Sequence, residues 1–151
     1  MENINLEQTK FNSESELKSY LGSLVLEYAS KMNEIEKDIF DKSEVEPKKD
    51  FFLEFKQRYL PIFETYCSDK QRVYGGQANS FGYPTKYDGI EMFVQQEVTL
   101  KNSNRAEVYF RTENSFEAEY LFVLVRKKGL WRIDSAKVRW YNETKWDSMI
   151  L

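Results

Sequence analysis

The residues best suited to chemistry in this chain are carboxylates and tyrosines in its second half. A phenol can polarise a carbonyl group while a neighbouring carboxylate moves a proton, so Asp134 with a tyrosine could act on a small molecule. The tyrosines in question are Tyr109 and Tyr120. The carboxylates that fall in segments with strand character are Glu97, Glu107, Glu119 and Asp134.

The same carboxylates have a structural interpretation. Acidic residues on a strand more often pair with basic residues on the neighbouring strand than take part in a reaction. The second half supplies many such partners: Arg111, Arg126, Arg132, Lys137 and Arg139. We therefore expect ion pairs rather than catalysis at these positions.

The amino-acid composition excludes most mechanisms of hydrolytic enzymes. The chain contains no histidine and one cysteine, Cys67, so catalytic triads, cysteine–histidine pairs, histidine metal sites and cysteine clusters all lack their parts. Cys67 follows a helical apolar stripe, which indicates a buried thiol rather than a nucleophile. The sequence thus predicts a protein that is not an enzyme and has no catalytic, cofactor or metal residues.

Two groups of residues are better suited to binding another protein. The segment 34–50 is rich in carboxylates, which either form a solvated helix end or steer the chain toward a basic partner. Aromatic residues near the polar C-terminus either fill the core or belong to an interface, where exposed Trp and Tyr are enriched. The candidate partner-binding residues are Glu34, Asp38, Asp41, Glu44, Trp140, Tyr141 and Trp146.

Charge and hydropathy argue against nucleic acid and membrane as partners. The chain has 22 basic and 25 acidic residues, which gives no strong field to concentrate a polyanion or an anionic lipid. The longest strongly apolar run, residues 120–125, is far shorter than the roughly 20 residues that cross a bilayer, and the first ten residues have no apolar signal core. We expect a cytoplasmic protein.

The first half of the chain has helical periodicity. We expect a single domain over residues 1–151, with a loose extension over residues 1–12, because 151 residues suffice for one substantial core. Ser13 and Glu16 fit a capping box, and an apolar stripe predicts a helix over residues 14–41. A polar loop then leads to a second stripe from Phe52 to Tyr66. Pro61 within it predicts a kink or two short helices.

The second half changes to strand periodicity. Residues 68–89 hold glycines, Pro84 and aromatic residues, which predicts a long structured loop or a loose hairpin. Alternation then predicts four long strands, of which the first begins at Ile90. Residues 120–125 are apolar on both faces and belong in mid-sheet. In the last strand, Trp131 and Ile133 fall on one face and Ala136, Val138 and Trp140 on the other. This order predicts an α+β fold: N-terminal helices packed on a strongly curved antiparallel sheet.

That order resembles the nuclear transport factor 2-like cone, in which the sheet wraps round the long first helix. Several short motifs sharpen the likeness: Tyr74-Gly75-Gly76, Ser80-Phe81, Pro84 with Tyr87, the run from Tyr120 to Arg126, Trp131-Arg132-Ile133-Asp134 and Lys145-Trp146. Together they resemble the immunity-protein branch of that superfamily, small bacterial proteins that neutralise a toxin made by the same cell. The resemblance covers residues 65–151 well and the helices only by length and order.

The resemblance implies a conical cavity and frequent pairing of two copies through the open sheet face. For the immunity branch it implies tight binding of a cognate protein toxin without catalysis. We therefore expect a non-catalytic immunity protein that occludes the active site of its toxin. The alternatives are a small-molecule-binding protein or isomerase- or dehydratase-like enzyme, which would need an unpaired carboxylate in a deep cone interior, and a homodimeric scaffold.

Overall fold

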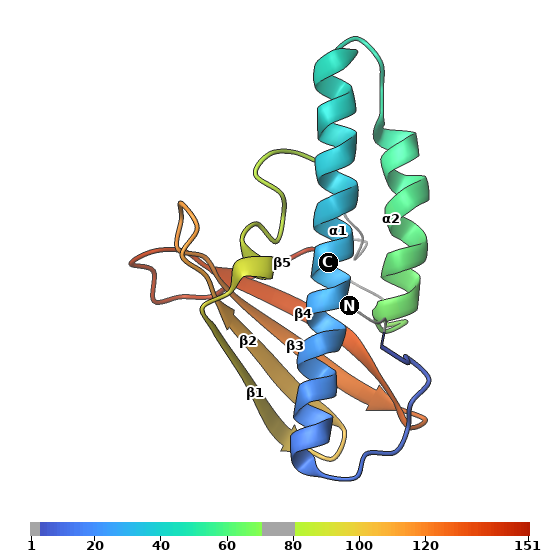
Figure 1. Ribbon diagram of the computed structural model, residues 1–151, viewed down its shortest axis with the longest axis vertical. Coiled ribbons are helices and arrows are strands. Elements are labelled where there is room, and N and C mark those ends of the chain that lie inside the picture. Colours follow the sequence, from blue (N-terminus) through green and yellow to red (C-terminus); the bar gives the residue numbers. More distant parts are fainter. Residues whose placement is uncertain (1–3, 71–80) are drawn as a thin grey trace.

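Two helices pack on a five-stranded antiparallel sheet in the computed structural model, which describes residues 4–70 and 81–151 (Figure 1). The sheet order is β1-β2-β3-β4-β5, so each strand pairs with its neighbours in sequence. The sheet is curled but not closed, and α1 lies against its inner face. The predicted α+β class is confirmed. The elements are α1 (Glu14–Val45), α2 (Phe52–Tyr66), the 3-10 helix η1 (Ile90–Met92), β1 (Gln95–Asn102), β2 (Arg105–Arg111), β3 (Glu119–Lys127), β4 (Leu130–Arg139) and β5 (Asp147–Met149).

The long first helix begins as predicted and ends later. Ser13 Oγ accepts the Glu16 N–H at 3.0 Å, while the Glu16 carboxylate accepts the Asn12 N–H at 2.9 Å, so the first turn is capped from both sides. The helix runs to Val45, four residues beyond the predicted end. Lys42 lies in this added turn, where its ammonium group pairs with a carboxylate of α2 and supports the extension.

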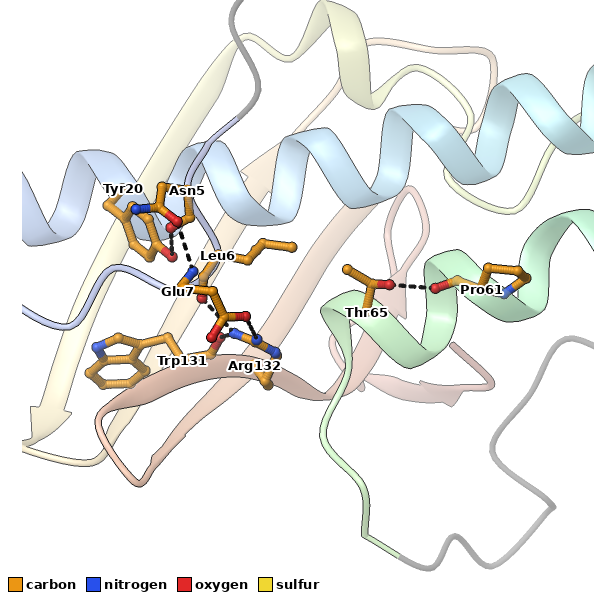
Figure 2. A network of polar contacts seen from close by, with 8 residues as sticks. All are labelled: Asn5, Leu6, Glu7, Tyr20, Pro61, Thr65, Trp131 and Arg132. Atoms are coloured by element: carbon orange, nitrogen blue, oxygen red, sulfur yellow. Dashed lines mark hydrogen bonds and ion pairs between the residues drawn. The ribbon is translucent and has the colours of Figure 1, made fainter.

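The second helix is one element, so of the two outcomes predicted at Pro61, a kink or two short helices, the division into two helices is wrong. Pro61 lies inside α2, where it removes one backbone donor and leaves the carbonyl of Gln57 without a helical partner. Both Pro61 and Gln57 are exposed, so water can satisfy that carbonyl. Thr65 Oγ donates to the Pro61 carbonyl at 2.7 Å in the following turn (Figure 2).

A β-bulge corrects the prediction for the faces of β4. The register pairs Leu124 with Ile133 but Val123 with Ser135, so Asp134 is an extra residue in β4. The extra residue shifts the side-chain alternation by one position. As a result Trp131, Ile133, Ala136 and Val138 all lie on the inner face and are all buried, rather than being divided between two faces.

The start of the first strand and the number of strands also differ from prediction. The first strand begins at Gln95, because residues 90–92 form η1 and leave Met92 exposed. A short fifth strand, β5, was not predicted; it pairs with the end of β4. The motif Tyr74-Gly75-Gly76 and Ser80 lie outside the described residues. Residues 81–89 form an irregular segment with a cis Tyr83–Pro84 bond that packs against α1.

The described interior is filled with large side chains. β3 lies in mid-sheet, as predicted, and its inner-face residues pack with α1 and with Tyr87. Cys67 is a buried thiol, as predicted. No helix among the described residues is long and apolar enough to span a bilayer. The largest fully buried side chains include Tyr28, Tyr59, Tyr87, Tyr120, Phe55, Phe110, Phe122 and Trp131.

Residues 4–12, which the sequence places in a loose extension, contact α1 and β4 (Figure 2). Arg132 of β4 donates from Nη1 to the Leu6 carbonyl at 3.0 Å and from Nη2 to the Glu7 carboxylate at 3.3 Å. The Tyr20 hydroxyl of α1 donates to the Asn5 carbonyl at 2.8 Å. This segment therefore joins α1 to the sheet.

Candidate functional site

A groove of about 420 Å³ lies at the end of the sheet where β2 ends and β3 begins. Its first wall is the irregular segment 81–88, and its second wall is the turn 112–118 between β2 and β3. Trp140 and Met149 line it from the ends of β4 and β5. We call this site the aromatic groove, because most of the apolar side chains along it are aromatic.

The first wall is tied to α1 by two buried side chains. The Glu36 carboxylate accepts the backbone N–H of Gly82 at 2.9 Å and of Lys86 at 2.8 Å. One turn earlier, the Asn33 amide bonds both backbone groups of Tyr87. Because side-chain groups of α1 satisfy the backbone of an irregular segment, that segment has a defined shape without belonging to a strand.

The second wall is held by its own polar side chains. Asn114 Oδ1 accepts the N–H groups of Phe116 and Ala118, which closes the turn. Asn114 Nδ2 donates to the Asp88 carbonyl at 3.0 Å, and the Tyr120 hydroxyl donates to the same carbonyl at 2.7 Å. These bonds join the two walls across the floor of the groove.

Three aromatic side chains stand out into solvent around the groove. Tyr83 is 71% exposed and stacks on Phe40 of α1, with the ring centroids 5.8 Å apart. Phe116 is 50% exposed and packs edge-on against Trp140 at 5.7 Å. Tyr141 is 64% exposed and donates its backbone N–H to the Phe116 carbonyl. Exposed aromatic residues held in one place by a supporting ring are typical of protein interfaces.

The electrostatics of the groove combine one weak cation with an acidic rim. Burial lowers the pKa of the Lys86 amine to about 8, against an opposing effect of the Glu36 carboxylate. Burial also raises the pKa of the Glu36 carboxyl, while its bonds to two backbone N–H groups act in the opposite direction. The segments that carry Phe116 and Tyr141 add three exposed carboxylates against the exposed basic side chains of Arg111 and Lys145, so the rim is slightly acidic: Glu113, Glu117 and Glu143.

The structure separates the three predicted aromatic residues. Trp140 lines the aromatic groove, whereas Tyr141 lines a neighbouring hollow together with Arg111 and Glu119. Trp146 lies instead on the outer face of the sheet, where its ring covers the Arg139 guanidinium at 4.5 Å and meets the Tyr109 ring edge-on at 6.3 Å. The connection between β4 and β5 thus does not gather its three aromatic residues at one site.

The predicted acidic residues lie along the C-terminal half of α1. Asp38 faces α2, where the Arg58 guanidinium donates to it and, together with Lys42, holds the pKa of that carboxyl below its ordinary value. Glu44 lies one helical turn after Phe40, and so on the side of α1 that carries Tyr83. The remaining two, Glu34 and Asp41, are exposed.

The residues considered for catalysis have structural partners and are not gathered in one place. Asp134 accepts from Ser68 Oγ at 2.8 Å and pairs with the Lys70 ammonium group at 2.8 Å. Glu119 forms the expected cross-strand pair with Arg139, two bonds of 2.9 Å each, and also accepts from the Tyr109 hydroxyl. Tyr120 lies at the groove, bound to Asp88. No three metal-ligating side chains gather within residues 4–70 and 81–151.

Three residues of the groove were not predicted from the sequence: Tyr83, Lys86 and Phe116. Phe116 offered one signal: it is a large apolar residue in an otherwise polar turn, Asn114-Ser115-Phe116-Glu117. A turn of this kind usually consists of polar residues, so the exception points to a contact outside the fold. Tyr83 gave no comparable signal, because its segment contains several aromatic residues of which most are buried.

The comparisons with known proteins give one match. A family model described as NTF2 fold immunity protein matches residues 21–149, which include both helices and all five strands apart from the first turns of α1. No curated protein and no solved structure matches the chain.

Proposed function

Because this chain belongs to the family of NTF2 fold immunity proteins, we propose that it binds a protein toxin of the producing cell and blocks it without catalysing a reaction. In this proposal the toxin is bound in the cytoplasm, through the aromatic groove. The family match over residues 21–149 carries the proposal, and the exposed aromatic residues around the groove support the choice of surface.

The groove has the composition of a binding site for another protein. Tyr83 and Phe116 project from two different segments, and each packs on an aromatic ring that fixes its position, while the backbone of Tyr141 is bonded to the Phe116 carbonyl beside them. Fixed aromatic side chains lose little conformational freedom on binding, so the apolar area they bury contributes to affinity with little opposing entropy.

The charge around the groove favours a basic partner. In the segments that carry Phe116 and Tyr141, the three exposed carboxylates outnumber the exposed basic side chains of Arg111 and Lys145, and Glu44 adds a carboxylate on α1. Lys86 is the basic side chain that lines the groove itself, and burial weakens its charge. Complementary charge raises the association rate and helps to select the partner. We infer that the toxin presents a basic surface, and that covering it denies the toxin access to its substrate.

Coexpression with the toxin encoded beside this chain tests the proposed function. We expect the wild-type protein to prevent killing and to form a complex that is stable on size-exclusion chromatography. Phe116→Ala and Tyr141→Ala should each raise the dissociation constant at least about thirtyfold, the effect of losing about 2 kcal/mol at an interface.

A matched control is Leu53→Ala, which removes an apolar side chain that is 65% exposed on α2, away from the groove. This variant should bind the toxin as the wild type does. Undiminished killing without a complex would refute the immunity function. Protection that survives both aromatic substitutions would refute the groove as the binding surface while leaving the function in place.

A further inference from the structure

The outermost strand β1 offers an open edge of eight residues. At the other edge of the sheet, β5 has only three residues, close to the buried C-terminal residue Leu151. β1 contains no proline and is regular from Gln95 to Leu100, with a bulge only at its end. Alternate backbone N–H and C=O groups of an edge strand point away from the sheet and can pair with another strand. Among the described residues, no backbone hydrogen bond covers this edge.

The sequence of β1 is complementary to itself in one antiparallel register. With Thr99 opposite Thr99 of a second copy, Val98 lies opposite Leu100 and Glu97 lies opposite Lys101. Val98 and Leu100 are half-buried residues of the inner face, so the pair would extend the apolar face across the contact. Glu97 and Lys101 lie on the outer face, where opposite charges on facing strands attract each other. Lys101, at the bulge, already pairs with Glu107 of its own chain at 3.2 Å, so the Glu97 carboxylate of the second copy would join that pair.

The neighbouring registers lack this match. Placing Val98 on the symmetry axis sets Glu97 opposite Thr99 and Gln96 opposite Leu100, which loses the ion pairs and faces an amide with an apolar side chain. Placing Glu97 on the axis sets two carboxylates against each other. Sliding one strand past the other by an odd number of residues would set inner-face residues of one copy opposite outer-face residues of the other.

We propose that two copies of this chain pair through their β1 strands, antiparallel and with Thr99 on the two-fold axis, to form one sheet that continues across the dimer. This contact differs from pairing through the open sheet face, where Trp146 of the same chain already covers Arg139 and meets Tyr109. None of the residues that line the aromatic groove belongs to β1, so both grooves of the dimer remain available.

Charge reversal with rescue tests the register. Sedimentation velocity over a range of protein concentrations should show a reversible dimer for the wild type. Glu97→Lys alone and Lys101→Glu alone each place like charges opposite each other twice, and each should raise the dimer dissociation constant about tenfold. The double variant Glu97→Lys/Lys101→Glu restores both ion pairs and should return the constant to within about threefold of the wild type.

Matched controls reverse the same charges at exposed positions off the strand, Glu143→Lys and Lys145→Glu, and should leave the dimer unchanged. Circular dichroism of each variant shows that it is folded. A wild-type protein that sediments as a monomer at every concentration would overturn the proposal. So would a dimer that neither single substitution weakens, or a double variant that stays as weak as the single ones.

Discussion

Asn33 of α1 and Tyr87 of the first groove wall are joined through both polar ends of one amide. Asn33 Oδ1 accepts the Tyr87 N–H at 3.0 Å, and Asn33 Nδ2 donates to the Tyr87 carbonyl at 2.8 Å. Both residues are buried, so the bonds have no ready substitute in water. The Asn33 side chain thus gives Tyr87 the two backbone hydrogen bonds that a neighbouring strand would give it in a sheet. These bonds determine where the wall lies on α1.

Replacing Asn33 with aspartate should loosen that wall. Aspartate has the same size, but it has lost the donor and places a carboxylate beside the Tyr87 carbonyl and the Glu91 carboxylate. We expect the free energy of unfolding to fall by about 2–3 kcal/mol in urea titrations, the cost of leaving a buried carbonyl without its donor. Glu34→Gln, at the exposed neighbouring position, should change it by less than about 0.5 kcal/mol. If the Asn33→Asp variant is as stable as the wild type, contacts other than the Asn33–Tyr87 bonds hold the wall.

Lys86 should give the protein a distinct pH dependence above neutrality. Its folded pKa of about 8 lies below the ordinary value of 10.5, so between these values the folded state holds fewer protons than the unfolded state. Stability therefore rises with pH in this interval, by at most about 1.4 kcal/mol per pH unit.

Lys86→Met removes this contribution and provides the comparison. The wild type should gain stability relative to the variant from pH 8 to pH 10, as measured by urea unfolding at each pH. Other groups titrate alike in both proteins and cancel. A difference between the two that stays constant over this range would show that the Lys86 amine keeps its ordinary pKa in the folded state.

Arg139→Lys should weaken the outer face without disturbing the groove. Lysine cannot form both bonds to Glu119 and presents no flat surface to the Trp146 ring. We expect a loss of about 1 kcal/mol at neutral pH, since the pair is partly screened by solvent. Hydrogen bonding from Arg139 lowers the folded pKa of Glu119, so this contribution is present above the ordinary carboxyl pKa and is lost as the pH falls through the folded value.

Thermal unfolding at pH 7 and at acid pH measures that change. Arg105→Lys, at an exposed position at the start of β2, is the matched control and should unfold like the wild type at both pH values. If the two substitutions have equal effects at pH 7, the Glu119–Arg139 pair does not stabilise the fold.

Arg132→Met should release residues 4–12 from the sheet while leaving the fold intact. The substitution keeps the apolar stem but loses the bonds to Leu6 and Glu7. We expect faster tryptic cleavage after Lys10 and faster amide exchange in this segment. Arg126→Met removes a guanidinium whose Nε bonds Asn104 in the turn between β1 and β2, and should not change either rate. Unchanged cleavage in the Arg132→Met variant would show that other contacts hold the segment.

The sequence contained the order of elements and the identity of most core residues, because those depend on periodicity along the chain. It did not reveal the β4 bulge. Asp134 and Ser135 continue a plausible alternation, and only the pairing with β3 shows that Asp134 is an extra residue. Pro61 predicted an interruption that the helix does not have. The effect of a proline on a helix depends on whether water reaches the carbonyl that it leaves without a partner, and the residue type alone does not show this.

The aromatic groove was only partly predictable for a related reason. Trp140 and Tyr141 could be named from composition, but their separation from Trp146 depends on how the chain turns between β4 and β5. Tyr83 and Phe116 are far apart in sequence and line the same groove because Glu36, Asn33 and Asn114 fix two irregular segments beside each other. Contacts of this kind between side chain and backbone leave no periodic pattern.

The walls of the groove are segments outside the strands, each held by a few amide and carboxylate side chains. Residues at their tips, such as Tyr83 and Phe116, can therefore be exchanged or moved by an insertion while the register of the sheet stays the same. Under the proposed function, this arrangement would let the groove adapt to a changed toxin surface while the sheet and its stability are preserved.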